Sequence, residues 1–340
     1  MSVKLRNINE QVMVITGATS GIGLTTARMA AEQGAKLVLA ARSADALDQL
    51  ASELRRKGTQ VATVAADVGN RADVERIGQA AMERFGRIDT WVNNAGISIF
   101  GRTEDIAPED HQRLFDTNFW GIVHGSLEAV RHMKTRGGGA LINLGSEASD
   151  RAVPLQVMYS ASKHAIKAFT DGLRMELEKE KAPISVTLIK PAAIDTMFTV
   201  HARNYMDKEP ALPPPIYAPE LVAKSILYSA QNPKRDVFIG GAAKMVSLGG
   251  WTMPRMIDRY MRGTMFRQQR SEADSMPGRR DALHAPDPSS ELRQRLGMSR
   301  HVAERSPYTA VTMRNTPLAA ALLGGGALFA AWGLTRRLAR

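Results

Sequence analysis

The sequence predicts an α/β fold: a doubly wound Rossmann-type parallel sheet of about seven strands with helices on both faces. Along the first 250 residues, short apolar runs alternate with longer amphipathic stretches, and parallel strands need crossover connections of that length. Gly34 and Gly58 stand where helices are expected to end, and Ser43 is an expected helix N-cap. The expected buried strands are 12–16, 36–41, 60–66, 90–93, 140–145, 185–191 and 237–240.

The first expected strand ends in a glycine-rich turn that leads into a helix. It consists of Thr16-Gly17-Ala18-Thr19-Ser20-Gly21-Ile22-Gly23. Glycines there let backbone N–H groups approach a pyrophosphate, whose charge the helix N-terminus also favours. By itself such a turn is weak evidence, because glycine-rich turns after strands are also common as plain structure. It lacks the Gly-Lys-Ser/Thr ending of a P-loop, which excludes ATP and GTP hydrolysis of that type.

An ordered set of motifs follows the other expected strands. Asp67-Val68 comes after the third strand, Asn93-Asn94-Ala95-Gly96 after the fourth, Asn118 in the next helix, Ser146 after the fifth strand, and Tyr159-Ser160-Ala161-Ser162-Lys163 begins thirteen residues later. Together with the glycine turn, this set resembles the short-chain dehydrogenase/reductase family over roughly residues 9–245. The family's fold agrees with the one predicted from strand alternation.

Tyr159 and Lys163 are four residues apart, so they project from the same face of a helix. An ammonium beside a tyrosine favours the phenolate, so we expect Lys163 and an oxidised nicotinamide to lower the pKa of Tyr159. Tyr159 is then the expected acid/base. The resemblance implies that Ser146 binds the substrate oxygen with Tyr159. It also implies that Lys163 binds the nicotinamide ribose, and that Asn118 interrupts its helix and holds a proton-relay water. The expected catalytic set is Asn118, Ser146, Tyr159 and Lys163.

The resemblance also implies a dinucleotide cofactor. Where relatives that prefer NAD carry an acid after the second strand, this chain has Ala41 followed by Arg42, and an arginine there can pair with a 2′-phosphate. We therefore expect NADP rather than NAD. Ala192 stands where the family usually has glycine. The expected cofactor-binding residues are Gly17, Thr19, Ser20, Gly21, Ile22, Gly23, Arg42, Asp67, Val68, Asn94, Ala95, Gly96, Tyr159, Lys163, Pro191, Ile194 and Thr196.

The expected reaction is hydride transfer between a nicotinamide and a carbonyl or alcohol carbon, with Tyr159 as acid/base. The long apolar stretch at 197–219 indicates a substrate loop and a non-polar substrate. The resemblance implies a homodimer or homotetramer. The alternative is a non-catalytic dinucleotide-binding sensor or membrane scaffold with the same fold, against which the intact Ser146, Tyr159 and Lys163 argue.

The amino-acid composition excludes several kinds of functional site. The chain has no cysteine, which excludes disulfides, thiolate nucleophiles and cysteine-ligated metals. Its histidines show no metal-ligand spacing, so no metal is expected. No apolar run opens the sequence, and we expect a cytoplasmic protein.

The net charge of +11 is uneven: residues 1–250 hold 30 basic against 27 acidic residues, and residues 251–340 hold 15, all arginine, against 7. This predicts an NADP-binding catalytic domain at 1–250, an Arg-rich and partly disordered extension at 251–316, and an apolar segment at 317–340. Residues 318–334 carry no charge and have the shortest length for a membrane span. We expect that segment to contact membrane lipid, the alternative being a helix packed on the enzyme. Nucleic acid is not an expected partner, because an uncharged run beside arginines suits a lipid surface better.

Overall fold

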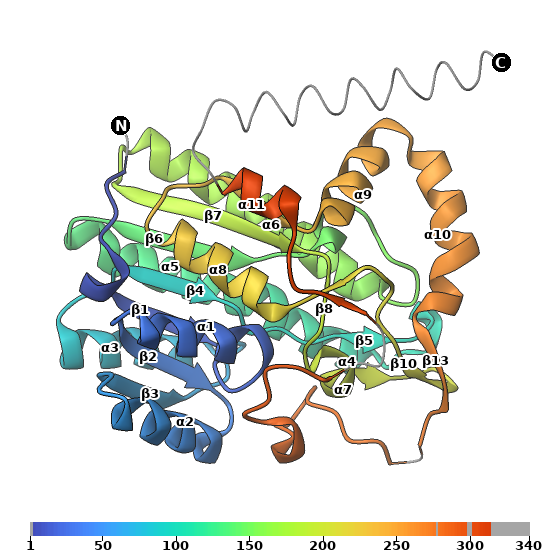
Figure 1. Ribbon diagram of the computed structural model, residues 1–340, viewed down its shortest axis with the longest axis horizontal. Coiled ribbons are helices and arrows are strands. Elements are labelled where there is room, and N and C mark those ends of the chain that lie inside the picture. Colours follow the sequence, from blue (N-terminus) through green and yellow to red (C-terminus); the bar gives the residue numbers. More distant parts are fainter. Residues whose placement is uncertain (1–2, 277, 298–300, 314–340) are drawn as a thin grey trace.

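The computed structural model describes residues 3–276, 278–297 and 301–313 (Figure 1). Its centre is a seven-stranded sheet in the order β12-β7-β6-β4-β1-β2-β3, in which every neighbouring pair is parallel. This confirms the predicted fold. The strands are β1 (Val12–Thr16), β2 (Lys36–Ala41), β3 (Val61–Ala65), β4 (Thr90–Asn93), β6 (Gly139–Leu144), β7 (Ile184–Pro191) and β12 (Asp236–Ile239).

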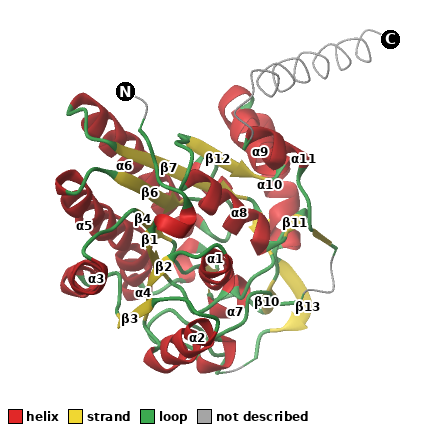
Figure 2. Cartoon of the chain, turned by 60° about the vertical axis from the view of Figure 1, so that its left-hand side comes forward, coloured by secondary structure: helices red, strands yellow, loops and turns green. Residues whose placement is uncertain are grey.

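Helices cover both faces of this sheet because successive strand residues point to opposite sides. In β1, Met13 and Ile15 belong to the core under one set of helices, and Val12 and Val14 to the core under the other. The first set is α1 (Gly21–Glu32), α2 (Ala44–Arg56) and α8 (Pro219–Ser229); the second is α3 (Arg71–Phe85), α5 (Gly121–Thr135) and α6 (Val157–Lys179). Figure 2 shows the sheet between these two layers.

The residues predicted to begin or end helices do so in the structure. The Ser43 hydroxyl accepts a hydrogen bond from the Ala46 amide at 3.3 Å and caps α2. Gly34 follows the end of α1 with a φ of 83°, a left-handed conformation that glycine adopts without steric cost. These positions fix where each helix stops and the chain turns into the next strand.

Shorter elements gather around the carboxyl ends of the strands. They are β5 (Ile99–Phe100), α4 (Pro108–Phe115), β8 (Ala193–Ile194), α7 (Phe198–His201), β9 (Arg203–Asn204), β10 (Lys208–Pro210), β11 (Ile216–Tyr217), α9 (Gly241–Thr252), α10 (Pro254–Gln268), β13 (Arg270–Asp274), β14 (Val302–Ala303) and α11 (Pro307–Thr312). In doubly wound folds this end of the sheet carries the ligand site.

The described residues after 250 pack against the first 250. Strand β13 pairs antiparallel with β10, β14 pairs parallel with β11, and α11 lies against β12. Leu283 is completely buried among Ile97, Ile99 and Leu114. The partners of these described residues lie far away in sequence, where local periodicity does not reveal them. The partial disorder expected within 251–316 stays a prediction. The three-part division of the chain stays a prediction.

The predicted apolar segment at 317–340 lies outside the described residues. Among the residues that the structure describes, no helix has both the length and the apolar character needed to cross a membrane.

Candidate active site

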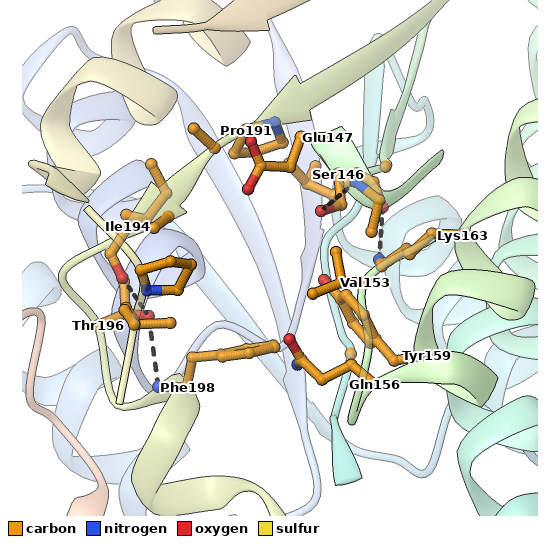
Figure 3. Close-up of a pocket in the computed structure, with 18 of the residues that line it drawn as sticks. Ser146, Glu147, Val153, Gln156, Tyr159, Lys163, Pro191, Ile194, Thr196 and Phe198 are labelled. Atoms are coloured by element: carbon orange, nitrogen blue, oxygen red, sulfur yellow. Dashed lines mark hydrogen bonds between the residues drawn. The ribbon is translucent and has the colours of Figure 1, made fainter. Parts of the chain in front are cut away.

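A cavity of about 320 Å³ lies at the carboxyl ends of β1, β4, β6 and β7 (Figure 3). It collects most of the predicted site residues: Gly17, Ser20, Gly21, Ile22, Asn94, Ala95, Gly96, Ser146, Tyr159, Lys163, Pro191, Ile194 and Thr196. Ala192 lines it as well. A smaller adjoining cavity of about 100 Å³ is lined by Thr19, Arg42, Asp67 and Val68. Only Gly23 and Asn118, among the predicted residues, line neither cavity.

The glycine turn has the geometry that close approach of a ligand requires. Gly17 and Gly21 have φ values of 64° and 51°, and Ser20 precedes the first residue of α1. A Cβ on Gly23 would lie 2.0 Å from the Gly17 carbonyl oxygen, so this position admits no side chain. The side-chain Nδ2 of Asn94 donates to the carbonyl oxygens of Thr16 and Gly17 at 2.9 and 3.1 Å. Asn94 therefore holds the turn in place against the end of β4.

Ser146, Tyr159 and Lys163 meet in the larger cavity. Ser146 follows β6, its hydroxyl accepts from the Ala148 amide at 3.1 Å, and it lines the same cavity as Tyr159. Tyr159 and Lys163 project from the first turns of α6, with the ammonium 5.6 Å from the centre of the tyrosine ring. The Lys163 ammonium donates to the Leu144 carbonyl oxygen at 2.9 Å. The ring of Tyr159 packs edge-on against Phe198 at 5.5 Å, which fixes its orientation.

Without a bound cofactor, burial has the largest effect on the pKa values of Tyr159 and Lys163. It raises the pKa of Tyr159 to about 12, although the Ser146 side chain acts in the opposite direction. It lowers the pKa of Lys163 to about 8. The sequence predicted a lowered Tyr159 pKa with Lys163 and a cationic nicotinamide beside it, and the chain alone gives the opposite direction because the phenolate loses its hydration. The lowered value stays a prediction for the cofactor complex.

Asn118 lies behind the cavity in a π-helical turn, Asp116–Trp120, between α4 and α5. Its carboxamide accepts from the Ile97 amide at 2.9 Å and donates to the Ile97 carbonyl at 3.0 Å and to the Ser162 hydroxyl at 3.2 Å. The side chain is completely buried. It thus ties the loop after β4 to α6, and the helix is interrupted where the resemblance implied. The water relay stays a prediction.

Glu147 is a cavity residue that the sequence analysis missed. It follows Ser146, and its carboxylate points into the cavity toward Pro191 (Figure 3). Burial raises the pKa of Glu147 to about 7. The signal that could have identified it is its position, one residue after a predicted catalytic serine at the carboxyl end of a strand.

A segment from the end of the chain covers the smaller cavity. We call residues 279–295 the strap. The Arg42 guanidinium donates to the carbonyl oxygens of Ala282 and, at 3.1 Å, Leu283. Arg113 donates to the same Leu283 oxygen at 3.0 Å and pairs with Asp67 at 2.6 Å. Two residues predicted to bind the adenosine half of a cofactor, Arg42 and Asp67, are therefore tied to the strap or to Arg113.

The strap also crosses the glycine turn. The Leu292 amide donates to the Thr19 carbonyl at 2.7 Å, and the Gly21 amide donates to the Arg293 carbonyl at 2.9 Å. The Gln294 side chain reaches Thr25 in α1 at 3.0 Å. The sequence analysis missed these contacts because they join residues more than 260 positions apart and no local motif marks them.

No group of three histidine or acidic side chains within the described part of the chain is placed to hold a metal ion. The residues around the two cavities instead suit a dinucleotide. The left-handed backbone at Gly17 and Gly21, which carry no side chain, leaves room for a pyrophosphate at the start of α1. The half-buried Arg42 supplies a positive charge beside the smaller cavity.

A family model described as short chain dehydrogenase matches residues 11–207. An uncharacterized oxidoreductase of Bacillus subtilis, YxnA, is 47% identical over 337 residues, which cover 98% of this chain and 93% of that protein.

Two solved structures are also similar. An alcohol dehydrogenase from Thermococcus sibiricus, complexed with 5-hydroxy-NADP, has a TM-score of 0.60 and 28% identity, covering 67% of this chain and 95% of that one. An L-sorbose reductase from Gluconobacter frateurii, complexed with NADPH and L-sorbose, has a TM-score of 0.60 and 27% identity, covering 71% and 98%.

Proposed function

Because the chain belongs to the short chain dehydrogenase family of oxidoreductases, we propose that it transfers a hydride between NADP and a carbonyl or alcohol carbon of a non-polar substrate. The observation that carries the proposal is the meeting of Ser146, Tyr159 and Lys163 in one cavity beside the glycine turn. A protein that only sensed nucleotide would not need an acid/base pair facing this space.

The choice of NADP rests on two observations. Ala41 ends β2 without a carboxylate, and Arg42 follows it with a guanidinium at the smaller cavity. Two similar structures were solved with NADPH or an NADP derivative. The turn at Gly17 and Gly21 would receive the pyrophosphate, Arg42 the 2′-phosphate and Lys163 the nicotinamide ribose, while Gly23 lets the turn pack closely. The bound nicotinamide supplies or accepts the hydride.

The chain's own residues then bind, orient and protonate the substrate oxygen. The Ser146 hydroxyl hydrogen-bonds the carbonyl oxygen and turns it toward Tyr159. The Tyr159 hydroxyl donates its proton to that oxygen as the carbonyl carbon is reduced, and takes the proton back in the oxidative direction. Lys163, held by the Leu144 carbonyl, keeps a positive charge close to the ring and stabilises the phenolate that remains.

The walls of the cavity support a non-polar substrate. Beside the polar Glu147, Arg151, Gln156 and His201, they include the apolar side chains of Val153, Met197, Phe198, Leu212, Met261 and Met265. The first part of the predicted substrate loop at 197–219 thus lines the cavity as α7 and its flanking residues. A substrate there would exchange water for apolar contacts, which favours binding in proportion to the area buried. The dimer or tetramer stays a prediction.

The test is Tyr159→Phe, with ketones and aldehydes screened by the loss of NADPH absorbance. We expect turnover to fall by more than about tenfold, which corresponds to about 1.4 kcal/mol of transition-state stabilisation, while NADPH affinity stays nearly the same. Tyr228→Phe is the matched control, because Tyr228 also lies 5.6 Å from a lysine ammonium but on α8, away from both cavities. Equal turnover in the two variants would refute general acid catalysis by Tyr159.

A further inference from the structure

The helical hairpin formed by α9 and α10, residues 241–268, carries an unusual number of large apolar side chains in contact with solvent. Trp251, at the connection between the two helices, is 85% exposed, and Met245 is 74% exposed. The complete exposed set on the hairpin is Met245, Leu248, Trp251, Met253, Met256, Tyr260 and Phe266. An exposed apolar patch of this kind marks an interaction surface.

The opposite side of α10 faces the protein. Met261 and Met265 are buried and line the larger cavity, together with Tyr260. Because helix positions three or four apart share a face, the inward residues leave 255, 256, 259 and 262 on the outer side. Figure 1 shows the hairpin at the edge of the molecule, with α11 close to its base. The hairpin is therefore one wall of the cavity and presents its other face outward.

The charge on this outer face has one sign. Arg255, Arg259, Arg262 and Arg267 are all exposed on α10, and none has an ion-pair partner within the part of the chain that the structure describes. The one carboxylate in residues 241–268 is Asp258, and it pairs with Arg151 of the body. Unpaired guanidinium groups thus lie beside the exposed apolar side chains.

We propose that the α9–α10 hairpin docks on the surface of an anionic lipid bilayer. Tryptophan and other apolar side chains enter the boundary between headgroups and acyl chains, and arginines attract acidic headgroups, so one face of this hairpin supplies both contributions. A second copy of the chain would bring arginines against arginines in a two-fold contact, which repels. Helix α11 reaches the start of the hairpin, since a Cβ on Gly241 would lie 3.7 Å from Tyr308.

The test is co-sedimentation of the full chain with phosphatidylcholine vesicles, with and without phosphatidylglycerol. Two double variants probe the two contributions: Leu248→Ser with Trp251→Ser, and Arg255→Glu with Arg259→Glu. None of these residues lines a cavity, so NADPH binding and far-UV circular dichroism should match the unmodified chain and report folding. The matched charge control is Arg56→Glu with Lys179→Glu, two exposed residues on α2 and α6.

We expect the unmodified chain to sediment with phosphatidylglycerol vesicles and to be released by added salt in part. Two basic residues near such a surface contribute about 30-fold in partitioning, so the Arg255/Arg259 variant should lose at least that much. The Leu248/Trp251 variant should lose binding to a similar degree, and the control should lose less than either. Trp251 emission should shift to shorter wavelength on binding.

Three results would overturn the proposal. One is no vesicle binding by the unmodified chain. Another is binding that neither hairpin variant weakens, which would assign it to another segment. The third is a dimer that the hairpin variants dissociate without any change in vesicle binding, which would make this face a contact between copies.

Discussion

Replacing Glu147 by glutamine should change how the stability of the folded chain depends on pH. The carboxyl group lies in the cavity beside Ser146, where burial raises its pKa from 4.5 to about 7. A raised carboxyl pKa means that the folded state binds the proton more tightly than the unfolded state does. The contribution of Glu147 to the free energy of unfolding is therefore highest below pH 4.5, falls as the pH rises toward 7, and is level above that.

The size of this effect follows from the same values. A difference of roughly 2.5 between the two pKa values corresponds to at most about 3.4 kcal/mol, of which about 2.5 kcal/mol is lost between about pH 5 and about pH 8. Glutamine keeps nearly the same shape and cannot ionise. The Glu147→Gln variant should thus gain stability relative to the natural chain as the pH rises, by up to that amount.

The measurement is urea unfolding of the cofactor-free protein, monitored by tryptophan fluorescence at several pH values across that interval. Glu104→Gln is the control, because Glu104 is 72% exposed and forms a surface ion pair with Arg102. Its difference from the natural chain should stay below about 0.5 kcal/mol at every pH. A Glu147→Gln difference that is constant with pH would show that the carboxylate ionises without cost, and would refute the reasoning from burial.

The remaining predictions concern the cofactor site. Arg42→Asp should abolish or reverse the preference for NADPH over NADH, measured as the ratio of dissociation constants; equal constants in the natural chain would contradict the assignment. Gly23→Ala should destabilise the chain by about 3 kcal/mol or more, because its Cβ would clash with the Gly17 carbonyl oxygen. Gly172→Ala, with open space around it on α6, should instead stabilise by about 1 kcal/mol, and urea unfolding measures both glycine variants. Lys163→Ala should lower both turnover and NADPH affinity, and a loss of turnover alone would exclude a role for Lys163 in holding the ribose.

The predicted strands agree with the sheet to within one or two residues at each end. The prediction for 60–66 became β3 at Val61–Ala65, and that for 140–145 became β6 at Gly139–Leu144. Buried parallel strands are short apolar runs, and this pattern is visible without knowledge of their partners. The same logic located the predicted site, because residues directly after parallel strands meet at one edge of the sheet.

The placement of the residues after 250 could not be predicted in this way. Leu283 packs against Ile97 and Leu114, and the strap carbonyls bind Arg42, across separations of roughly 170 to 240 positions. The strap has no sustained periodicity, since its backbone is held by side chains and turns of the body rather than by a ladder or helix of its own. Its composition alone therefore favoured disorder.

The sequence by itself determined the sheet, the glycine turn and the spacing of Tyr159 and Lys163, because each depends on residues that are close along the chain. Only the tertiary structure decided that the strap covers the adenosine side, that Glu147 faces the cavity, and that no described segment of the chain covers the outer face of α10. Only the structure also decided the direction of the Tyr159 pKa in the chain alone, because desolvation depends on everything packed around the hydroxyl. Burial is a property of the whole fold, and no short segment of sequence contains it.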